Sequence, residues 1–180
     1  TVEFMRQIWE RVTWRAASIG TIGVRGTDIH DTNTPLAHIP QLTTPDCISL
    51  HANVAEITKQ GIMHLAIEAS SHGLHQHRLD GLNIHVAGFT NLSRDHLDHH
   101  HNMDDYFVAK ARLFDTLLNE GGGAVVNIDD PYGKKLARKI TKRPIVVKTL
   151  GTNKEADFHI QQITTTDAGL DLKVVYHDKT

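Results

Sequence analysis

The chain has 180 residues, enough for one domain with a complete hydrophobic core or for one domain plus a fragment. Lys and Arg number 19 against 21 Asp and Glu, so the net charge of −2 gives no electrostatic case for binding nucleic acid or an anionic membrane. No apolar run approaches the roughly 20 residues of a membrane span, and no signal-peptide pattern opens the chain. The single cysteine, Cys47, excludes an internal disulfide framework and favours the reducing cytoplasm.

The first part of the chain predicts two helices and two strands. Residues 1–14 carry apolar side chains at helical spacing and predict an amphipathic helix. A short strand is expected over residues 18–24, where three nearby glycines indicate either close backbone approach or turns. A helix is expected over residues 48–59 with Asp46 as its N-cap. The apolar run 62–67 then predicts a buried strand.

Polar residues follow this strand and the next one. Glu68 stands directly after the first, with Ser70 or Ser71 placed to cap a short helix. The run 84–89 predicts another strand, and residues 102–118 predict a helix. Tyr106, Lys110 and Phe114 fall on one face of that helix, where a lysine is most simply a side chain whose charged end reaches solvent.

The remaining elements complete an α/β pattern. A glycine-rich turn at 121–123 should lead into a strand ending near residue 127, followed by a helix over 131–140 that Asp130 caps. A strand is expected over 144–150. Alternating residues then predict a hairpin with arms 158–163 and 170–176.

These elements predict an α/β fold, a three-layer sandwich around a mostly parallel sheet with an antiparallel hairpin at its C-terminal edge. We expect one domain over residues 1–180, with a parallel core over 1–150 and the hairpin segment over 156–177.

The carboxyl ends of parallel strands meet at one edge of a sheet, where ligands bind. Glu68 and the polar residues 91–98 are therefore expected at one site. Glu68 is placed like the acidic residue that holds Mg²⁺ in phosphoryl-transfer enzymes. His96 is an unusual ligand for so hard a cation. The adjacent histidines 99–101 predict a loop that could bind metal adventitiously rather than a zinc site, because neighbouring residues rarely converge on one ion.

Three stretches carry a resemblance to a known family: residues 68–78 (EASSHGLHQHR), 89–98 (FTNLSRDHLD) and 106–114 (YFVAKARLF). They resemble the central domain of the Mur ligases, above all the MurE type, which adds the third amino acid to UDP-N-acetylmuramoyl-L-alanyl-D-glutamate (UDP-MurNAc-L-Ala-D-Glu). The resemblance extends from residue 1 to about residue 149.

The resemblance implies an ATP-dependent, Mg²⁺-dependent ligase that acts as a cytoplasmic monomer through an acyl phosphate. It places the metal on Glu68, His96 and a carbamylated Lys110, which makes these three the catalytic candidates. It assigns the substrate to five side chains, several of which also suit turns or caps: Thr43, Thr44, Ser70, Gln76 and Arg78. The third amino acid is expected to be meso-diaminopimelate rather than L-lysine.

One part of the family pattern is missing. No stretch fits the phosphate-binding pattern G-x-x-x-x-G-K-[ST]; Gly151 begins a partial match that lacks the second glycine. We therefore expect a fragment of the enzyme, truncated at both ends, that binds ATP weakly and is inactive alone. Another Mur ligase or folylpolyglutamate synthetase is an alternative within the class. A non-catalytic metal- or nucleotide-sugar-binding domain is the alternative outside it.

Overall fold

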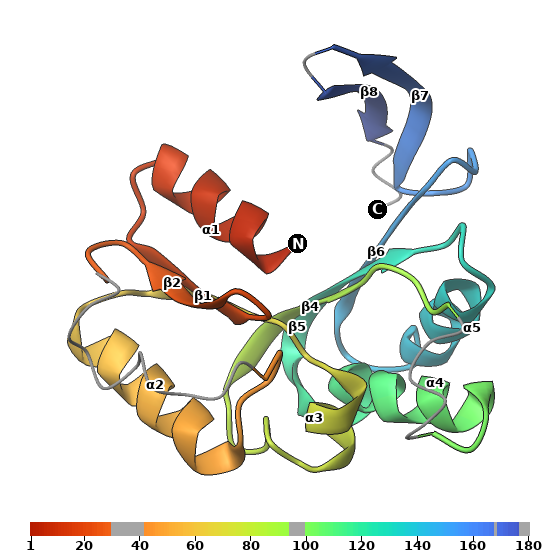
Figure 1. Cartoon of the computed structure of the whole chain (residues 1–180). Coiled ribbons are helices and arrows are strands. Elements are labelled where there is room, and N and C mark those ends of the chain that lie inside the picture. The colour runs from red at the N-terminus through yellow and green to blue at the C-terminus, as the bar shows by residue number, and fades with distance from the viewer. Residues whose placement is uncertain (30–41, 94–99, 168, 177–180) are drawn as a thin grey trace. The chain divides into compact units, whose positions relative to one another are not determined.

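The computed structural model describes residues 1–29, 42–93, 100–167 and 169–176, and it divides into two compact units (Figure 1). Unit 1 is Thr1–Leu82 and holds a three-stranded sheet; unit 2 is Asn83–Thr180 and holds a five-stranded sheet. The α/β class is confirmed, as are the predominance of parallel pairing and the C-terminal antiparallel hairpin. None of the described helices is long and apolar enough to cross a membrane.

The sheet of unit 1 has the order β2-β1-β3. Strand β1 (Ala16–Gly20) is completely buried, and it pairs antiparallel with β2 (Gly23–Gly26) and parallel with β3 (His64–Ile67). The strand predicted over residues 18–24 is two strands joined by a turn, which is one of the two interpretations that its glycines leave open. The chain reverses at Thr21 and Ile22, and the φ of +86° at Gly23 supplies the left-handed conformation that this tight turn requires.

Helix α1 (Val2–Arg11) is amphipathic as predicted, but its polar side faces the sheet. Glu3 Oε2 accepts a hydrogen bond from Ser18 Oγ on β1 (3.0 Å), and the guanidinium of Arg6 donates to both oxygens of Glu3. The bonds from Arg6 lower the pKa of the Glu3 carboxyl to about 2. The apolar residues on the other side are largely exposed, including Phe4 at 71% and Ile8 at 55%.

The rest of unit 1 consists of two helices. Helix α2 (Cys47–Lys59) begins as predicted, because Asp46 Oδ1 accepts a hydrogen bond from Ser49 N at 3.0 Å. Helix α3 (Ser71–His75) is short and follows β3 after a brief polar segment. Its N-cap is Ser70, whose Oγ accepts a hydrogen bond from Gly73 N at 3.0 Å.

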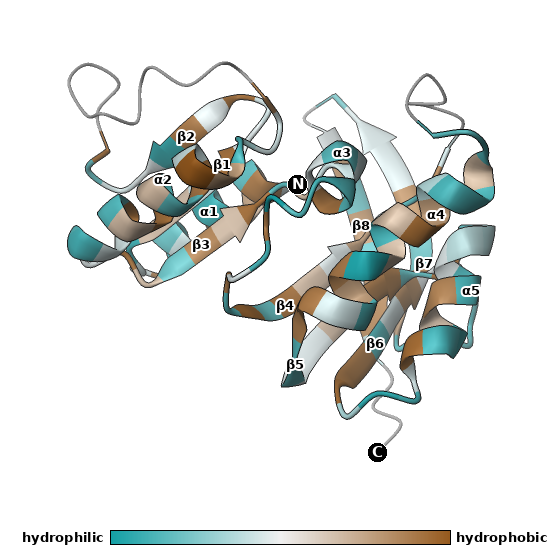
Figure 2. Cartoon of the chain, turned by 90° about the horizontal axis from the view of Figure 1, so that it is seen from below, coloured by the Kyte–Doolittle hydropathy of each residue, from teal (hydrophilic) through white to brown (hydrophobic). Residues whose placement is uncertain are grey.

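The sheet of unit 2 has the order β4-β5-β6-β7-β8, parallel except for the last pair. Alternate residues near the end of β4 (Ile84–Phe89) are buried, so the helices of this unit cover one face of the sheet. Helix α5 (Pro131–Ile140) packs on β5 (Leu118–Asn127) and β6 (Val146–Gly151). Brown and teal bands both occur on its ribbon in Figure 2, and its buried residues Gly133, Leu136, Ala137 and Ile140 recur at the spacing of one helical face.

Two boundaries in unit 2 differ from prediction. The helix expected to reach residue 118 ends earlier: α4 (Met103–Arg112) passes into the π-helical turn η2 (Leu113–Leu117), and β5 begins at Leu118. The glycines at 121–123 therefore lie inside a strand rather than in a turn before it. The register of β4 and β5 shifts here, and a Cβ at Gly122 would lie 2.7 Å from His85 O, so glycine permits the close approach of the two strands.

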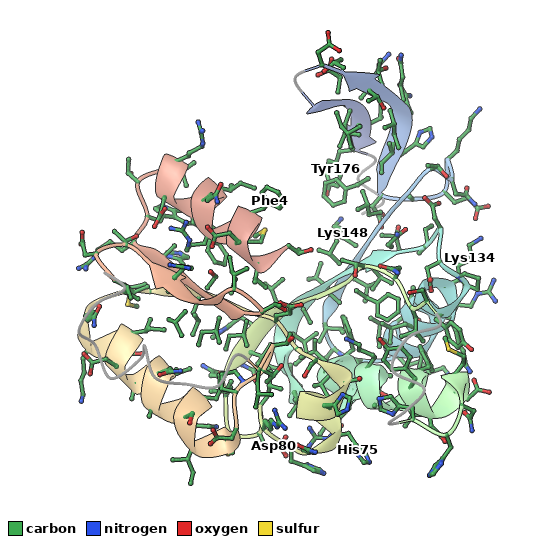
Figure 3. All side chains as sticks on the ribbon, in the orientation of Figure 1. Phe4, His75, Asp80, Lys134, Lys148 and Tyr176 are labelled. Carbon is green, nitrogen blue, oxygen red and sulfur yellow. The ribbon has the colours of Figure 1, made fainter. Side chains whose placement is uncertain are left out.

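The C-terminal hairpin has longer arms than predicted. It consists of β7 (Phe158–Thr166) and β8 (Gly169–Tyr176). Tyr176 stacks on Phe158 with ring centroids 4.8 Å apart, and Lys148 Nζ of β6 lies 5.3 Å from the centroid of the Tyr176 ring (Figure 3). These contacts join the base of the hairpin to the parallel part of the sheet.

Candidate functional site

The carboxylate of Glu68 is held at the end of β3 by residues from the end of β1. Glu68 N donates to Ile19 O (2.8 Å), which continues the parallel pairing by one residue. Glu68 Oε2 accepts two hydrogen bonds from Thr21, one from the backbone N and one from Oγ1, each 3.1 Å long. Among the described residues, none donates to Glu68 Oε1. One oxygen of the carboxylate is therefore fixed, and the other is left for a ligand.

The two threonines before α2 occupy different environments. Thr43 is partly exposed, and its Oγ1 lies 3.1 Å from Thr21 Oγ1. Thr44 is 1% exposed, and its hydroxyl donates to Glu68 O (2.6 Å) and accepts from Ser70 N (2.9 Å). Thr44 thus satisfies two backbone groups on either side of Ala69. The sequence alone does not reveal this structural role of Thr44.

Arg78 joins the segment after α3 to the segment before α2. Its Nη1 donates to Thr44 O (2.6 Å), while Nε and Nη2 both donate to Gln76 Oε1 (3.0 and 2.5 Å). A guanidinium carries five N–H groups, so two of them have no acceptor among the described residues. The amide nitrogen of Gln76 likewise has no described partner, and its side chain is exposed.

Six residues predicted from the sequence therefore lie in one connected hydrogen-bond network within unit 1: Glu68, Thr43, Thr44, Ser70, Gln76 and Arg78. His75 and Asp80, labelled in Figure 3, mark the α3 end of this unit. Counting partners among the described residues alone, the network combines a carboxylate with one unpaired oxygen, a guanidinium with two remaining donors and several hydroxyls. Such a set suits a divalent cation together with an anionic, hydroxyl-rich molecule.

The other two predicted catalytic residues belong to unit 2. His96 lies outside the described residues, as do Asp95, Asp98 and His99. Lys110 is on α4, and its Nζ lies 5.9 Å from the centroid of the Tyr106 ring. Within the described ranges, no group of three or more His, Cys, Asp or Glu side chains is arranged to hold a metal ion.

Comparison with known proteins identifies the family. The Mur ligase middle domain matches residues 1–180. The chain belongs to this family. Curated relatives named UDP-N-acetylmuramoyl-L-alanyl-D-glutamate–2,6-diaminopimelate ligase include those of Agrobacterium fabrum (47% identical over 150 residues, 83% of this chain) and Zymomonas mobilis (36% identical over 180 residues, 96% of this chain).

A solved structure of a ligase with the same name supports the fold of this Mur ligase middle domain. It superposes with a TM-score of 0.80 at 31% identity and covers 97% of this chain. The chain spans about a third of the length of these proteins: 29% of the Agrobacterium relative, 36% of the Zymomonas relative and 34% of the solved chain.

The two carboxylates after β5, Asp129 and Asp130, have structural partners in this Mur ligase middle domain. Asp130 caps α5 through Gly133 N (2.9 Å) and also accepts from Leu92 N (3.1 Å). Asp129 accepts hydrogen bonds from the backbone N of Thr152 (2.9 Å) and from its hydroxyl (3.1 Å). Both carboxylates therefore tie the ends of neighbouring strands together.

Thr21 is the member of the network that the sequence reasoning missed. A single strand over residues 18–24 places Thr21 inside the sheet instead of at its carboxyl edge. The glycines at positions 20, 23 and 26 indicate close backbone approach or a turn without deciding between them, and the positive φ of Gly23 is what the turn uses.

Proposed function

We propose that the whole protein is an ATP-dependent ligase that joins meso-diaminopimelate to UDP-MurNAc-L-Ala-D-Glu, with residues 1–180 as its central domain. The observation that carries the proposal is the Glu68 carboxylate, with one oxygen held by Thr21 and the other unpaired among the described residues, in a network with the guanidinium of Arg78. The names and identities of the relatives support it. We further propose a cytoplasmic monomer that requires neither nucleic acid nor a membrane.

The substrate contacts follow from the donors and acceptors that remain in the network. Arg78 would present its two remaining N–H groups to a carboxylate or phosphate of the nucleotide-sugar dipeptide. Gln76 Nε2 would donate beside it, and Ser70 would donate its hydroxyl proton while its lone pair caps α3. Thr43 would contact the same ligand, and Thr44 would act by holding Glu68 and Ser70 in place.

Mg²⁺ fits the donor set, because the free Oε1 of Glu68 is a hard carboxylate oxygen. Glu68, His96 and Lys110 would hold the metal, which would neutralise charge on the phosphates of ATP. An unmodified lysine ammonium would repel a cation. Addition of CO2 to the neutral amine of Lys110, with loss of one proton, would give an N-carboxylate that attracts it instead.

The reaction would proceed in two displacements. An oxygen of the D-glutamyl carboxylate attacks the γ-phosphorus of ATP, and ADP leaves, which gives an acyl phosphate. The amine of diaminopimelate then attacks the acyl carbon, phosphate leaves, and the nitrogen loses a proton. The contribution of this domain is to orient the carboxylate and hold compensating charge around it. We assign none of the described residues to a phosphate-binding loop.

The test is ADP release by the longest chain that the gene encodes, with UDP-MurNAc-L-Ala-D-Glu and either meso-diaminopimelate or L-lysine. Release that requires both the dipeptide and diaminopimelate would support the proposal, and dependence on L-lysine would correct the amino acid. If the protein binds the nucleotide sugar or Mg²⁺ but releases no ADP with either amine, the non-catalytic binding domain is the better description.

Carbamylation of Lys110 has a separate test. Protein equilibrated with ¹³C-labelled bicarbonate should show one carbamate carbon resonance that disappears in Lys110→Arg. The other basic residue of α4 is Arg112, so the matched control comes from the neighbouring helix α5, where Lys135→Arg should keep the resonance. A resonance that survives Lys110→Arg would contradict the assignment.

A further inference from the structure

We propose that Thr21 is a positioning residue that links the metal-binding carboxylate of Glu68 to the substrate-binding hydroxyl of Thr43, and that it makes Thr43 a hydrogen-bond acceptor toward the substrate. The inference rests on the proposed function for the identity of the two ligands. Its geometry rests on three contacts of 3.1 Å: two from Thr21 to Glu68 Oε2 and one between the hydroxyls of Thr21 and Thr43.

The direction of these hydrogen bonds follows from counting protons. The hydroxyl of Thr21 has one proton and lies 3.1 Å from both Glu68 Oε2 and Thr43 Oγ1. An ionised carboxylate only accepts, so the proton of Thr21 is directed to Glu68. The proton between the two threonines must then come from Thr43. The chain of donors therefore runs from Thr43 to Thr21 to Glu68.

This direction determines what Thr43 can recognise. With its proton committed to Thr21, the Thr43 oxygen has only lone pairs left for a ligand. A substrate group that contacts it must be a donor, such as a peptide N–H or a sugar hydroxyl, and a carboxylate or phosphate oxygen would meet an acceptor. The anionic groups of the substrate are left to Arg78, whose two remaining N–H groups can only donate.

The backbone of the turn between β1 and β2 fixes the position of Thr21. It follows β1 directly, in the two-residue turn between Gly20 and Gly23. A Cβ at Gly20 would lie 2.7 Å from Glu68 Oε2, so the absence of a side chain at this residue lets the carboxylate approach the Thr21 amide. Both donors of Thr21 act on Oε2, which leaves Oε1 for the metal.

The experiment compares Thr21→Val, which keeps the shape and the backbone donor but removes the hydroxyl, with Thr21→Ser, which restores it. Thr58→Val is the matched control, because the Thr58 hydroxyl bonds the carbonyl of Val54 within α2, away from the network. Mn²⁺ affinity is measured by electron paramagnetic resonance on the longest encoded chain without ATP, and KM for UDP-MurNAc-L-Ala-D-Glu is measured separately by ADP release.

We expect Thr21→Val to weaken Mn²⁺ binding and to raise the KM for the nucleotide sugar, each by about tenfold, with Thr21→Ser and Thr58→Val within about twofold of wild type. We also expect Thr43→Val to raise KM less in the Thr21→Val background than alone, because the two hydroxyls act as one chain. Unchanged Mn²⁺ affinity in Thr21→Val, or multiplicative effects of the two valines on KM, would overturn the proposal.

The readouts separate this proposal from the proposed function. A wild-type protein without ligase activity contradicts the function, and its Mn²⁺ affinities still test the link between Thr21 and Glu68. If Thr21→Val does not fold, judged by its thermal melting curve, Thr21→Cys takes its place, because a thiol of similar size is a much weaker donor. The same two outcomes then apply.

Discussion

Replacing Thr44 by valine tests whether its buried hydroxyl holds the site together. Valine has nearly the same shape, so the change removes the oxygen and leaves the packing in place. Thr44 is 1% exposed, and water therefore cannot substitute for the hydroxyl. Glu68 O and Ser70 N each lose the partner that they have in this structure, at 2.6 and 2.9 Å.

A buried backbone group left without a partner costs about 1–3 kcal/mol. Both hydrogen bonds are only partly buried, so about 1–2 kcal/mol is expected for each group and roughly 2–4 kcal/mol in total for the loss of unfolding free energy. For a protein of this size, that corresponds to a fall in Tm of about 5–15 °C. Urea unfolding followed by circular dichroism would measure it. Thr44→Ser is the control: it keeps the hydroxyl and loses only the methyl group near Gly73, for about 1 kcal/mol. A valine variant as stable as the serine variant would refute the reasoning.

Three further changes test other parts of the fold. Gly133→Ala would place a Cβ against Asn127 O. We expect urea unfolding to show a loss of about 3 kcal/mol or more of unfolding free energy, or the variant to yield no soluble protein. A variant as stable as wild type would contradict this close approach. Asp130→Ala removes the cap of α5 and should cost about 1–2 kcal/mol in the same assay; a change below about 0.3 kcal/mol would contradict the capping role. Glu3→Gln should lower stability at pH 7. The Glu3 pKa is depressed from 4.5 to about 2, so its contribution is present above pH 4.5 and is lost as the pH falls toward 2; the gap between wild type and variant should close over that range, and a constant gap would contradict it.

The elements that the sequence predicts well have local signals that agree with their burial. Helix α5 has Asp130 as a cap, Pro131 in its first turn and a buried stripe that includes Leu136 and Ile140, and its bounds match the prediction. Helix α2 is predicted to within one residue for the same reason, with Asp46 as its cap.

The errors arise where backbone geometry, rather than hydrophobic pattern, decides the structure. The turn at Thr21 and Ile22 interrupts a run that reads as one continuous strand in the sequence. The π-helical turn Leu113–Leu117 keeps helical spacing while ending the α-helix at Arg112. The glycines of β5 are typical of a turn, and the register shift that they permit depends on a neighbouring strand. None of these three features produces a distinct pattern of hydrophobic residues, which is the signal that predicts helices and strands from sequence.

The orientation of α1 is also beyond the sequence. A pattern with apolar residues on one side and Glu3, Arg6 and Glu10 on the other normally places the apolar side inward. Here Glu3 accepts a hydrogen bond from Ser18 Oγ on β1, and Glu10 accepts one from Thr27 Oγ1, directly after β2 (2.8 Å). Hydroxyl groups therefore lie against the charged side of the helix. The hydrophobic pattern predicts the helix correctly but not the side that faces β1 and β3.

The candidate site is predicted largely by resemblance, and the structure shows why residue types alone leave its roles open. Ser70 caps α3 and Thr44 bonds two backbone groups, so each has a complete structural explanation. A loss of activity on replacing either residue would therefore not demonstrate contact with a substrate. Gln76 is different, because it is exposed and its described side-chain contact is with Arg78 alone. A Gln76→Glu variant that folds normally but binds the proposed nucleotide-sugar substrate more weakly would show that Gln76 acts in recognition and not only in the scaffold. The added charge would oppose an anionic ligand, while the hydrogen bonds to Arg78 would remain.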